Sequence, residues 1–517
     1  MSLARRIRRV RPLALAFALV VGALFLYPRS SAAAAESNHA ICENGVIAAK
    51  PASPTANSDE APGSAPIRAV TSAEVVAACT AEIDSGRFTG ADLAAIYNDR
   101  GLGYRDGGAP HRAIADYTEA LGLNPRSVSA LVNRGTAFAD LGEYRRALAD
   151  VDRALEIAPT NVKALSNRGL IFMDTQRYAL ARADFNRVVA IDPHDGKAYG
   201  LRGFVEYMQG DRARALPDFN HAIAANHRDA LSLGLRGKLY ADEGKDAPAL
   251  ADLDRAIALT PGDALVYEWR AHVRYARGEF RLAVADDTRA LQRNPKLGSA
   301  FDGRGFAELD LGELAVASVD FSRAIAIDAS DASGYEGRAE AENLQGHPAA
   351  AFTDYAAAIR VDPKSPYGYA SRGNLYFERG SYALAARDLA RAIARNDRSP
   401  YVVLWLHLAR VHSHANDTKE FAANTARLHG KGWPLPVVAL FLGRARPAAT
   451  FAAAARASAA GKPNHDLCEA NFYIGEWELG RRATAEAKKH LSVAVQSCPH
   501  TFIEYSGARA EVSRLPR

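Results

Sequence analysis

Arginine and aspartate recur in this chain of 517 residues at positions suited to ion pairing rather than to catalysis. Nine arginines follow one another at one constant spacing, and an aspartate stands at one fixed distance after each of them. A guanidinium and a carboxylate can form a bidentate ion pair. Because recognition of a ligand would vary from copy to copy, nine identical copies favour a structural ladder of ion pairs, within or between repeated units. The two series are Arg100, Arg134, Arg168, Arg202, Arg236, Arg270, Arg304, Arg338 and Arg372, and Asp116, Asp150, Asp184, Asp218, Asp252, Asp286, Asp320, Asp354 and Asp388.

Residues typical of metal or nucleophilic chemistry are sparse. One histidine cluster is present, formed by His407, His412, His414 and His429. Histidines two residues apart on a helix point to different faces, and no carboxylate near them in the sequence completes a set of metal ligands. The motifs of serine hydrolases, zinc proteases and P-loop nucleotidases are absent from the sequence. We therefore expect a protein without catalytic activity, metal or small-molecule cofactor.

The arginines are spaced 34 residues apart, which defines a repeated unit of that length. Each unit contains two predicted helices. In the second unit, apolar residues at helical spacing predict one helix over residues 128–141 and another over residues 144–157. Gly142 ends the first of these helices, and Pro159 stops the second. No strand-rich segment remains once such units are assigned, so the sequence predicts an all-α fold of stacked helix pairs.

The unit resembles the tetratricopeptide (TPR) repeat family. In the first unit, the family pattern is carried by Gly101, Tyr104, Gly108, Ala113, Tyr117, Ala120 and Pro125. The resemblance covers residues 94–399 as nine units. It implies a right-handed α-solenoid in which the first helix of each pair lines a concave groove that binds protein or peptide partners.

By the same resemblance, one position of the first helix faces the groove, and six of its nine occupants are acidic. We expect these carboxylates to bind basic or polar peptide segments, although they could instead only solvate the end of the helix. Lys163, Asn167 and Asn133 partly resemble the carboxylate clamp of some TPR domains, with one basic residue in place of two. The six acidic residues are Asp106, Asp140, Asp174, Asp242, Asp310 and Glu378.

Both ends of the repeat array are expected to be capped. Residues 71–93 hold a predicted N-terminal capping helix, whose Thr71 and Glu74 have the spacing of a capping box. Residues 400–467 are predicted to be divergent helical repeats, and residues 468–517 a last repeat with a capping helix over 502–515. The stretch containing Trp433-Pro434, residues 468–476 and residues 502–505 resembles bacterial periplasmic TPR adaptors of NlpI type. That resemblance implies a role in bringing cell-envelope proteases and cell-wall hydrolases together.

Residues 1–35 have the form of a secretory signal peptide. Basic residues precede an apolar run from Leu13 to Tyr27, and the small residues Ala32–Ala35 offer a cleavage site. We therefore expect export to the periplasm or beyond, followed by a flexible linker over residues 36–70 that is rich in Pro, Ala and Ser. The alternative is an uncleaved segment over residues 12–27 that anchors the chain in the membrane.

Four cysteines lie in two pairs near the ends of the chain: Cys42 with Cys79, and Cys468 with Cys498. No CxxC spacing indicates zinc or redox chemistry. In an exported protein we expect two disulfides, with Cys42 bonded to Cys79 and Cys468 to Cys498, since this pairing alone avoids linking the two ends of the chain. Without export, buried free thiols are the alternative.

The charge balance argues against nucleic-acid binding. The formal net charge is +5, but six arginines and no acidic residue stand in the first 35 residues, so the remainder carries about −1. Residues 400–517 carry +6 and residues 36–399 carry −7. The function expected from the sequence is a non-catalytic scaffold for protein partners. The alternatives are a membrane-tethered assembly factor and an enzyme with a helical catalytic insert at residues 400–467.

Overall fold

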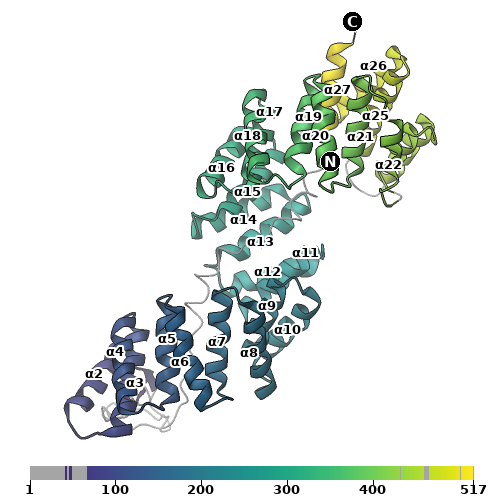
Figure 1. Ribbon diagram of the computed structural model, residues 1–517. Helices are drawn as coiled ribbons and strands as arrows, with labels where there is room; N and C mark the ends of the chain where they lie inside the picture. The colour runs from purple at the N-terminus through teal and green to yellow at the C-terminus, as the bar shows by residue number, and fades with distance from the viewer. Residues whose placement is uncertain are drawn as a thin grey trace, which may run out of the picture. The chain divides into compact units, whose positions relative to one another are not determined.

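The computed structural model describes residues 41–42, 46–48, 67–430, 432–458, 465–500 and 502–515. They fall into two compact units, which divide between Leu239 and Tyr240, inside helix α11 (Ala230–Asp242). Each unit is described here by itself (Figure 1). The predicted signal peptide at residues 1–35 and most of the predicted linker lie outside the described residues.

The first unit is a stack of helices that follow one another along the chain. Each helix packs against the next, and the first helices of neighbouring repeats also touch, α3 with α5 and α5 with α7. This is the packing of an α-solenoid, in which a repeat buries its apolar face only against its neighbours. The helices are α2 (Ser72–Asp84), α3 (Gly90–Asp106), α4 (Pro110–Leu123), α5 (Val128–Asp140), α6 (Tyr144–Ile157), α7 (Val162–Asp174), α8 (Tyr178–Ile191), α9 (Gly196–Met208) and α10 (Arg212–Ala225).

The second unit continues the same alternation of first and second helices. Its first helices α13, α15 and α17 touch in turn, as do α19 and α21. The helices are α12 (Asp246–Leu259), α13 (Ala264–Ala276), α14 (Phe280–Arg293), α15 (Gly298–Asp310), α16 (Leu314–Ile327), α17 (Ala332–Leu344), α18 (Pro348–Val361), α19 (Tyr367–Glu378), α20 (Tyr382–Ala394), α21 (Pro400–His412), α22 (Thr418–Thr425), α23 (Leu435–Phe441), α24 (Pro447–Ser458), α25 (His465–Gly480), α26 (Thr484–Ser497) and α27 (Ile503–Arg514).

Small residues let the paired helices approach closely. At Gly169 of α7, an added Cβ would lie 2.7 Å from a ring carbon of Phe185 on α8, so any larger residue would push the two helices apart. Gly142, which follows α5, has a φ of 73°, the left-handed conformation that lets the chain turn sharply into α6. The predicted helices of the second unit, 128–141 and 144–157, agree with α5 and α6 to within one residue.

The C-terminal part of the second unit has one large core. Trp405 of α21 is fully buried, and its ring lies 4.8 Å from that of Phe377 and 5.1 Å from that of Phe472. Helix α27 corresponds to the predicted capping helix and packs on both α19 and α25. Among the helices of the described ranges, none is both long enough and apolar enough to cross a membrane.

The chain before the repeats is more ordered at its edges than a flexible linker would be. Strands β1 (Val46–Ala48) and β2 (Ile67–Ala69) pair antiparallel, with Ile47 opposite Arg68. These two strands correct the prediction of a linker throughout residues 36–70, because backbone hydrogen bonds hold both edges of that segment. They are also the exception to the all-α solenoid, which is otherwise confirmed.

Two predicted local features are present as expected. Thr71 and Glu74 form the reciprocal capping box at the start of α2. The disulfides join Cys42 to Cys79 and Cys468 to Cys498, with Cα atoms 4.9 and 5.1 Å apart. The second disulfide links the start of α25 to the residue that follows α26, so it closes the last helix pair.

Candidate functional site

The arginine–aspartate ladder is a structural element that runs through both units. In seven repeats the guanidinium donates to both oxygens of the aspartate of its own repeat, at 2.5–2.9 Å. Arg372 makes one such bond to Asp388, at 2.7 Å. The eight aspartates are all buried. The predicted ion pairs therefore lie within the repeats.

Eight of these guanidinium groups also reach the helix that precedes their own repeat, which the sequence did not predict. The Nη1 atom of Arg168 donates to Asp152 at 2.7 Å, and that of Arg134 donates to Thr118 at 3.1 Å. The same bond forms from five further arginines to the residue at the matching position of the preceding second helix, and Arg100 reaches Thr80 of α2. One arginine thus joins three helices, which fixes the register of neighbouring repeats. The remaining pairs are Arg100–Thr80, Arg202–Asn186, Arg236–Asn220, Arg270–Asp254, Arg304–Thr288 and Arg338–Ser322.

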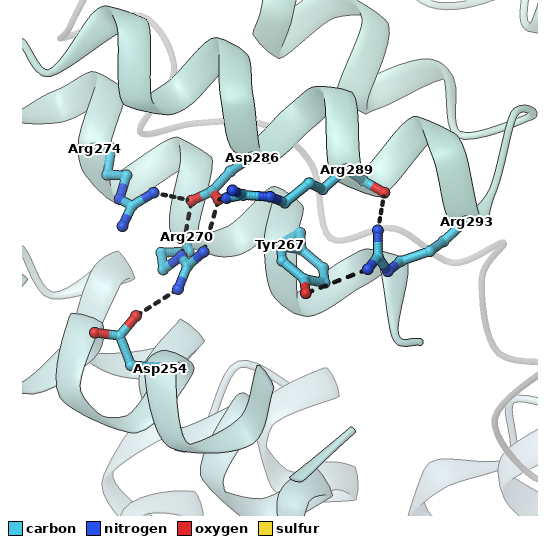
Figure 2. A network of polar contacts seen from close by, with 7 residues as sticks. All are labelled: Asp254, Tyr267, Arg270, Arg274, Asp286, Arg289 and Arg293. Carbon is cyan, nitrogen blue, oxygen red and sulfur yellow. Dashed lines mark hydrogen bonds and ion pairs between the residues drawn. The ribbon is translucent and has the colours of Figure 1, made fainter. Parts of the chain in front are cut away.

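In the sixth repeat, three arginines donate hydrogen bonds to one carboxylate. Asp286 of α14 is fully buried and accepts hydrogen bonds from Arg270, Arg274 and Arg289 (Figure 2). Arg270 also extends to Asp254 of α12, so the network ties α12, α13 and α14 together. These arginines are engaged within the fold rather than presented to a partner.

The predicted groove carboxylates lie at the ends of first helices, and two of them accept hydrogen bonds from the preceding repeat. Tyr275 of α13 donates its hydroxyl proton to Asp310 at the end of α15. In the same way, Asn343 of α17 donates to Glu378 of α19 at 3.1 Å. Asp106 and Asp140 are exposed, whereas Asp174, Asp242, Asp310 and Glu378 are partly buried. In the first unit, the neighbour of Asp106 is Arg105, 3.1 Å away.

In the second unit, further acidic residues lie on the same first helices as the predicted groove carboxylates. The sequence analysis did not predict them. Together the carboxylates of α13, α15, α17 and α19 form what we call the acidic face: Glu268, Asp302, Asp310, Glu336, Glu340 and Glu378. A signal was available, because Glu268, Asp302 and Glu336 recur with the period of the arginine ladder at another position of the first helix. The missed residues lie where the first helices pack on one another.

The acidic face carries negative charge in a partly buried setting. Burial raises the pKa of Asp310 to about 6; the Tyr275 hydrogen bond opposes this rise, and the charge of Glu340 adds to it. Burial likewise raises the pKa of Glu378 to about 7, again with a contribution from Glu340. Glu340 therefore acts on the acids of both neighbouring repeats. A cation held here would relieve repulsion that the folded chain otherwise contains.

The residues proposed as a partial carboxylate clamp do meet in the first unit. Lys163 Nζ donates to Asn133 Oδ1 at 2.9 Å, and Asn133 Nδ2 donates to Asn98 Oδ1 at 2.9 Å. Asn167 instead donates to Thr136, at 2.8 Å. Burial lowers the pKa of Lys163, and the nearby Arg105 lowers it further. This face of the first unit is therefore mixed in charge, unlike the acidic face of the second.

The expectation that no carboxylate completes a metal-ligand set around the histidines is wrong for His412. Its Nε2 lies 2.8 Å from Glu476, and one ligand atom each of His412, Glu476 and Glu511 fall within 4.8 Å of one another. The sequence could not show this, because Glu476 lies far along the chain from His412. Burial alone would lower the pKa of His412, but the hydrogen bond with Glu476 raises it overall. Glu511 also accepts from Tyr382 and Arg514, so cationic and neutral side chains already surround this set.

Comparison with known proteins identifies the repeat. The family model for the tetratricopeptide repeat matches residues 98–162, 132–196 and 336–403. The first two matches begin one period of the arginine ladder apart. The chain therefore contains tetratricopeptide repeats, and proteins built from them generally serve as scaffolds for protein interaction. No curated protein sequence matches this chain.

Solved structures of repeat proteins resemble parts of the chain at low identity. A tetratricopeptide repeat protein from Parabacteroides merdae is 24% identical, covers 46% of this chain and 92% of its own, and has a TM-score of 0.38. YrrB, described as a TPR protein with an unusual peptide-binding site, is 22% identical over 36% of this chain and 95% of its own, with a TM-score of 0.30. The Cut9–Hcn1 complex is 14% identical over 85% of this chain and 93% of its own, with a TM-score of 0.46.

Proposed function

We propose that this tetratricopeptide-repeat protein is an exported, non-catalytic scaffold that binds cationic segments of protein partners on its acidic face. The observation that carries the proposal is the placement of six carboxylates on four consecutive first helices of the second unit, where Glu340 acts electrostatically on Asp310 and Glu378. Asp310 and Glu378 accept hydrogen bonds from the neutral side chains of Tyr275 and Asn343, so these bonds bring no positive charge to the two carboxyl groups. Such a surface attracts lysine- and arginine-rich segments and orients them along the groove.

Export is supported by the signal-like residues 1–35 and by the two disulfides, which persist in oxidising compartments. The resemblance of the C-terminal stretch to periplasmic adaptors of NlpI type suggests a role in cell-envelope maintenance. The apolar run from Leu13 to Tyr27 favours a second candidate, a membrane-tethered assembly factor. The mass of the mature protein separates the two, because loss of residues up to about Ala35 leaves no anchor.

Neutralising the acidic face should abolish most of its binding without unfolding the protein. We expect the variant Asp310→Asn, Glu340→Gln, Glu378→Gln to bind a fluorescein-labelled pool of dodecapeptides, each with four lysines, at least about tenfold more weakly than the wild type. Amides keep a hydrogen-bond acceptor for Tyr275 and Asn343, and the removed charges repel one another. The thermal midpoint should therefore stay the same or rise. Fluorescence anisotropy at low salt measures the affinity.

The matched control neutralises three acids outside the acidic face: Glu313→Gln, Asp328→Asn, Glu486→Gln. These exposed residues flank or begin second helices of the same unit. The control changes the net charge equally, so it should bind the pool within about twofold of the wild type. Equal loss in both variants would mean that the peptides respond to overall charge, and the acidic face would not be the binding site.

A further inference from the structure

One repeat of the second unit carries an aspartate where every other repeat has an apolar residue. Asp287 of α14 occupies the slot at which the second helix packs against the small residues of its partner. In the other repeats the slot holds Tyr117, Val151, Phe185, Phe219, Leu253, Phe321, Tyr355 and Leu389, all of which are buried. An aspartate here exchanges apolar packing for a buried carboxylate, which is costly unless something else compensates it.

No side chain of the described residues donates a hydrogen bond to Asp287 Oδ1. Its exposed fraction is 2%, and its Oδ1 atom has no hydrogen-bond partner. Arg304 acts electrostatically on Asp287, but it donates its hydrogen bonds to Asp320 and Thr288. The adjacent Asp286 gathers three arginines, whereas Asp287 has none. Burial and the charges of Glu268, Asp286 and Asp320 raise the pKa of Asp287 well above its ordinary value.

The surroundings of Asp287 are arranged around oxygen atoms of the acidic face. At Gly303 of α15, an added Cβ would lie only 2.8 Å from Asp287 Oδ2, so the glycine makes room for the carboxylate. Asp302, next to Gly303, is 7% exposed, and its Oδ1 also lacks a partner. Ser299, one helical turn earlier, has a buried hydroxyl oxygen without a partner.

Two more acids act on this group of oxygens. Burial raises the pKa of Asp302 well above its ordinary value, and Asp331, the N-cap residue of α17, adds to this rise. Glu268 of α13 acts electrostatically on both Asp287 and Asp302. Acidic residues of α13, α14, α15 and the start of α17 thus influence one another electrostatically, all within the second unit.

The chemistry of these acceptors selects a compact cation with several donors. Asp287 Oδ1, Asp302 Oδ1 and Ser299 Oγ are three acceptors without donors, and a primary ammonium group offers three N–H donors. The low exposure of Asp287 and Asp302 favours a charged head on a slim, unbranched stem. Lysine has both features, whereas the planar guanidinium of arginine is wider and offers its donors in a fixed fork.

We propose that Asp287, Asp302 and Ser299, with Glu268 beside them, bind the ε-ammonium group of a lysine side chain from a peptide bound on the acidic face. This inference rests on the proposed function and adds that the acidic face prefers lysine among the residues of a bound peptide. It explains why Asp287 stands in an apolar slot, because the lysine of the partner supplies the missing donors. Asp287 is then retained for binding at the expense of stability.

The test combines stability with lysine preference in the full-length protein. Asp287→Leu restores the residue type that Leu253 and Leu389 have in this slot, and Asp287→Asn keeps the size while removing the charge. Binding is measured by anisotropy with three labelled dodecapeptide pools, in which the central residue is fixed as lysine, arginine or norleucine and the others are random and neutral. We expect the wild type to bind the lysine pool about tenfold more tightly than the norleucine pool and several-fold more tightly than the arginine pool.

Both Asp287 variants should lose this preference and bind the three pools alike. The thermal midpoint of at least one of them should rise by about 2–4 °C, because an uncompensated buried carboxylate has been removed. Equal binding of the lysine and arginine pools by the wild type would overturn the ammonium assignment and leave the proposed function standing. Failure of the wild type to bind any pool, including the four-lysine pool, would contradict the proposed function itself.

A metal ion is the remaining occupant that the experiment must separate. If millimolar CaCl₂ raises the thermal midpoint of the wild type but not that of Asp287→Asn, the site holds a divalent cation and the lysine assignment is wrong. If both variants fall well below the wild type in thermal midpoint, Asp287 supports the fold and the proposal fails.

Discussion

Replacing Arg168 by alanine is expected to destabilise the protein by about 3–5 kcal/mol, because it removes one partner of a buried ion pair. The guanidinium donates to both oxygens of Asp184 and to Asp152 of the preceding repeat. Its loss leaves the Asp184 carboxylate, 3% exposed, without its cation. Asp184→Ala should be similarly harmful, because it leaves the guanidinium without its buried partner. Urea unfolding followed by circular dichroism measures the change.

The matched control is Asp152→Asn, which alters the exposed partner of the same arginine. Asp152 has a side-chain exposure of 51%, so its ion pair with Arg168 is solvated, and its loss should cost at most about 1 kcal/mol. The double variant Arg168→Ala, Asp184→Ala should be less destabilised than the sum of the single variants, because neither charge is then left alone. If the single variants have the same urea midpoint of unfolding as the wild type, the ladder does not hold the repeats in register.

Removal of the disulfide between Cys468 and Cys498 is expected to loosen the C-terminal end before the central repeats. The bond closes a loop of 30 residues around α25 and α26, and such a loop contributes about 2–4 kcal/mol. Because α25 packs on α27 and α23, the effect should extend through residues 465–515. In the variant Cys468→Ser, Cys498→Ser, limited proteolysis should cut this region first, as seen by mass spectrometry of the fragments.

The corresponding control removes the other disulfide, with Cys42→Ser and Cys79→Ser. That variant should leave the C-terminal fragment as resistant as in the wild type, since the Cys42–Cys79 bond joins residues at the other end of the chain. If both cysteines of the C-terminal pair react with an alkylating reagent in non-reduced protein from the cell envelope, the bond is absent there. That outcome would also weaken the argument for export.

The fixed period explains why so much of the fold is readable from the sequence. The equivalents of Arg168 and Asp184 are separated by the same number of residues in every repeat. Their pairing therefore follows from the antiparallel packing of the two helices of a repeat. The capping box at Thr71 lies within one helix start, and the Cys468–Cys498 bond lies within one helix pair, so both could also be predicted from the sequence. Features that depend on the neighbouring repeat were missed. The bond from Arg168 to Asp152 and the meeting of Asn343 with Glu378 need the stacking of helices that only the structure shows.

Long-range contacts and single deviations from the repeat pattern were the least predictable. His412 meets Glu476 because α21 and α25 are brought together in the C-terminal core. The pairing of β1 with β2 joins the two edges of a segment that has no apolar period. Asp287 differs from its counterparts by residue type alone, and its lack of a hydrogen-bond donor at Oδ1 becomes visible once the arginines around Asp286 are placed.

Binding on the acidic face is tested most directly by site-specific photo-crosslinking in the cells that produce the protein. A photoreactive residue at Ala276, which ends α13 and occupies the repeat position of Asp310, is compared with one at Val319, whose exposed fraction on α16 is 51%. The account predicts that Ala276 crosslinks to a partner protein through a lysine-containing segment, that Val319 does not, and that Asp310→Asn, Glu340→Gln, Glu378→Gln abolishes the crosslink. Crosslinks from Val319 alone, or an Ala276 crosslink unaffected by the three substitutions, would contradict binding on the acidic face.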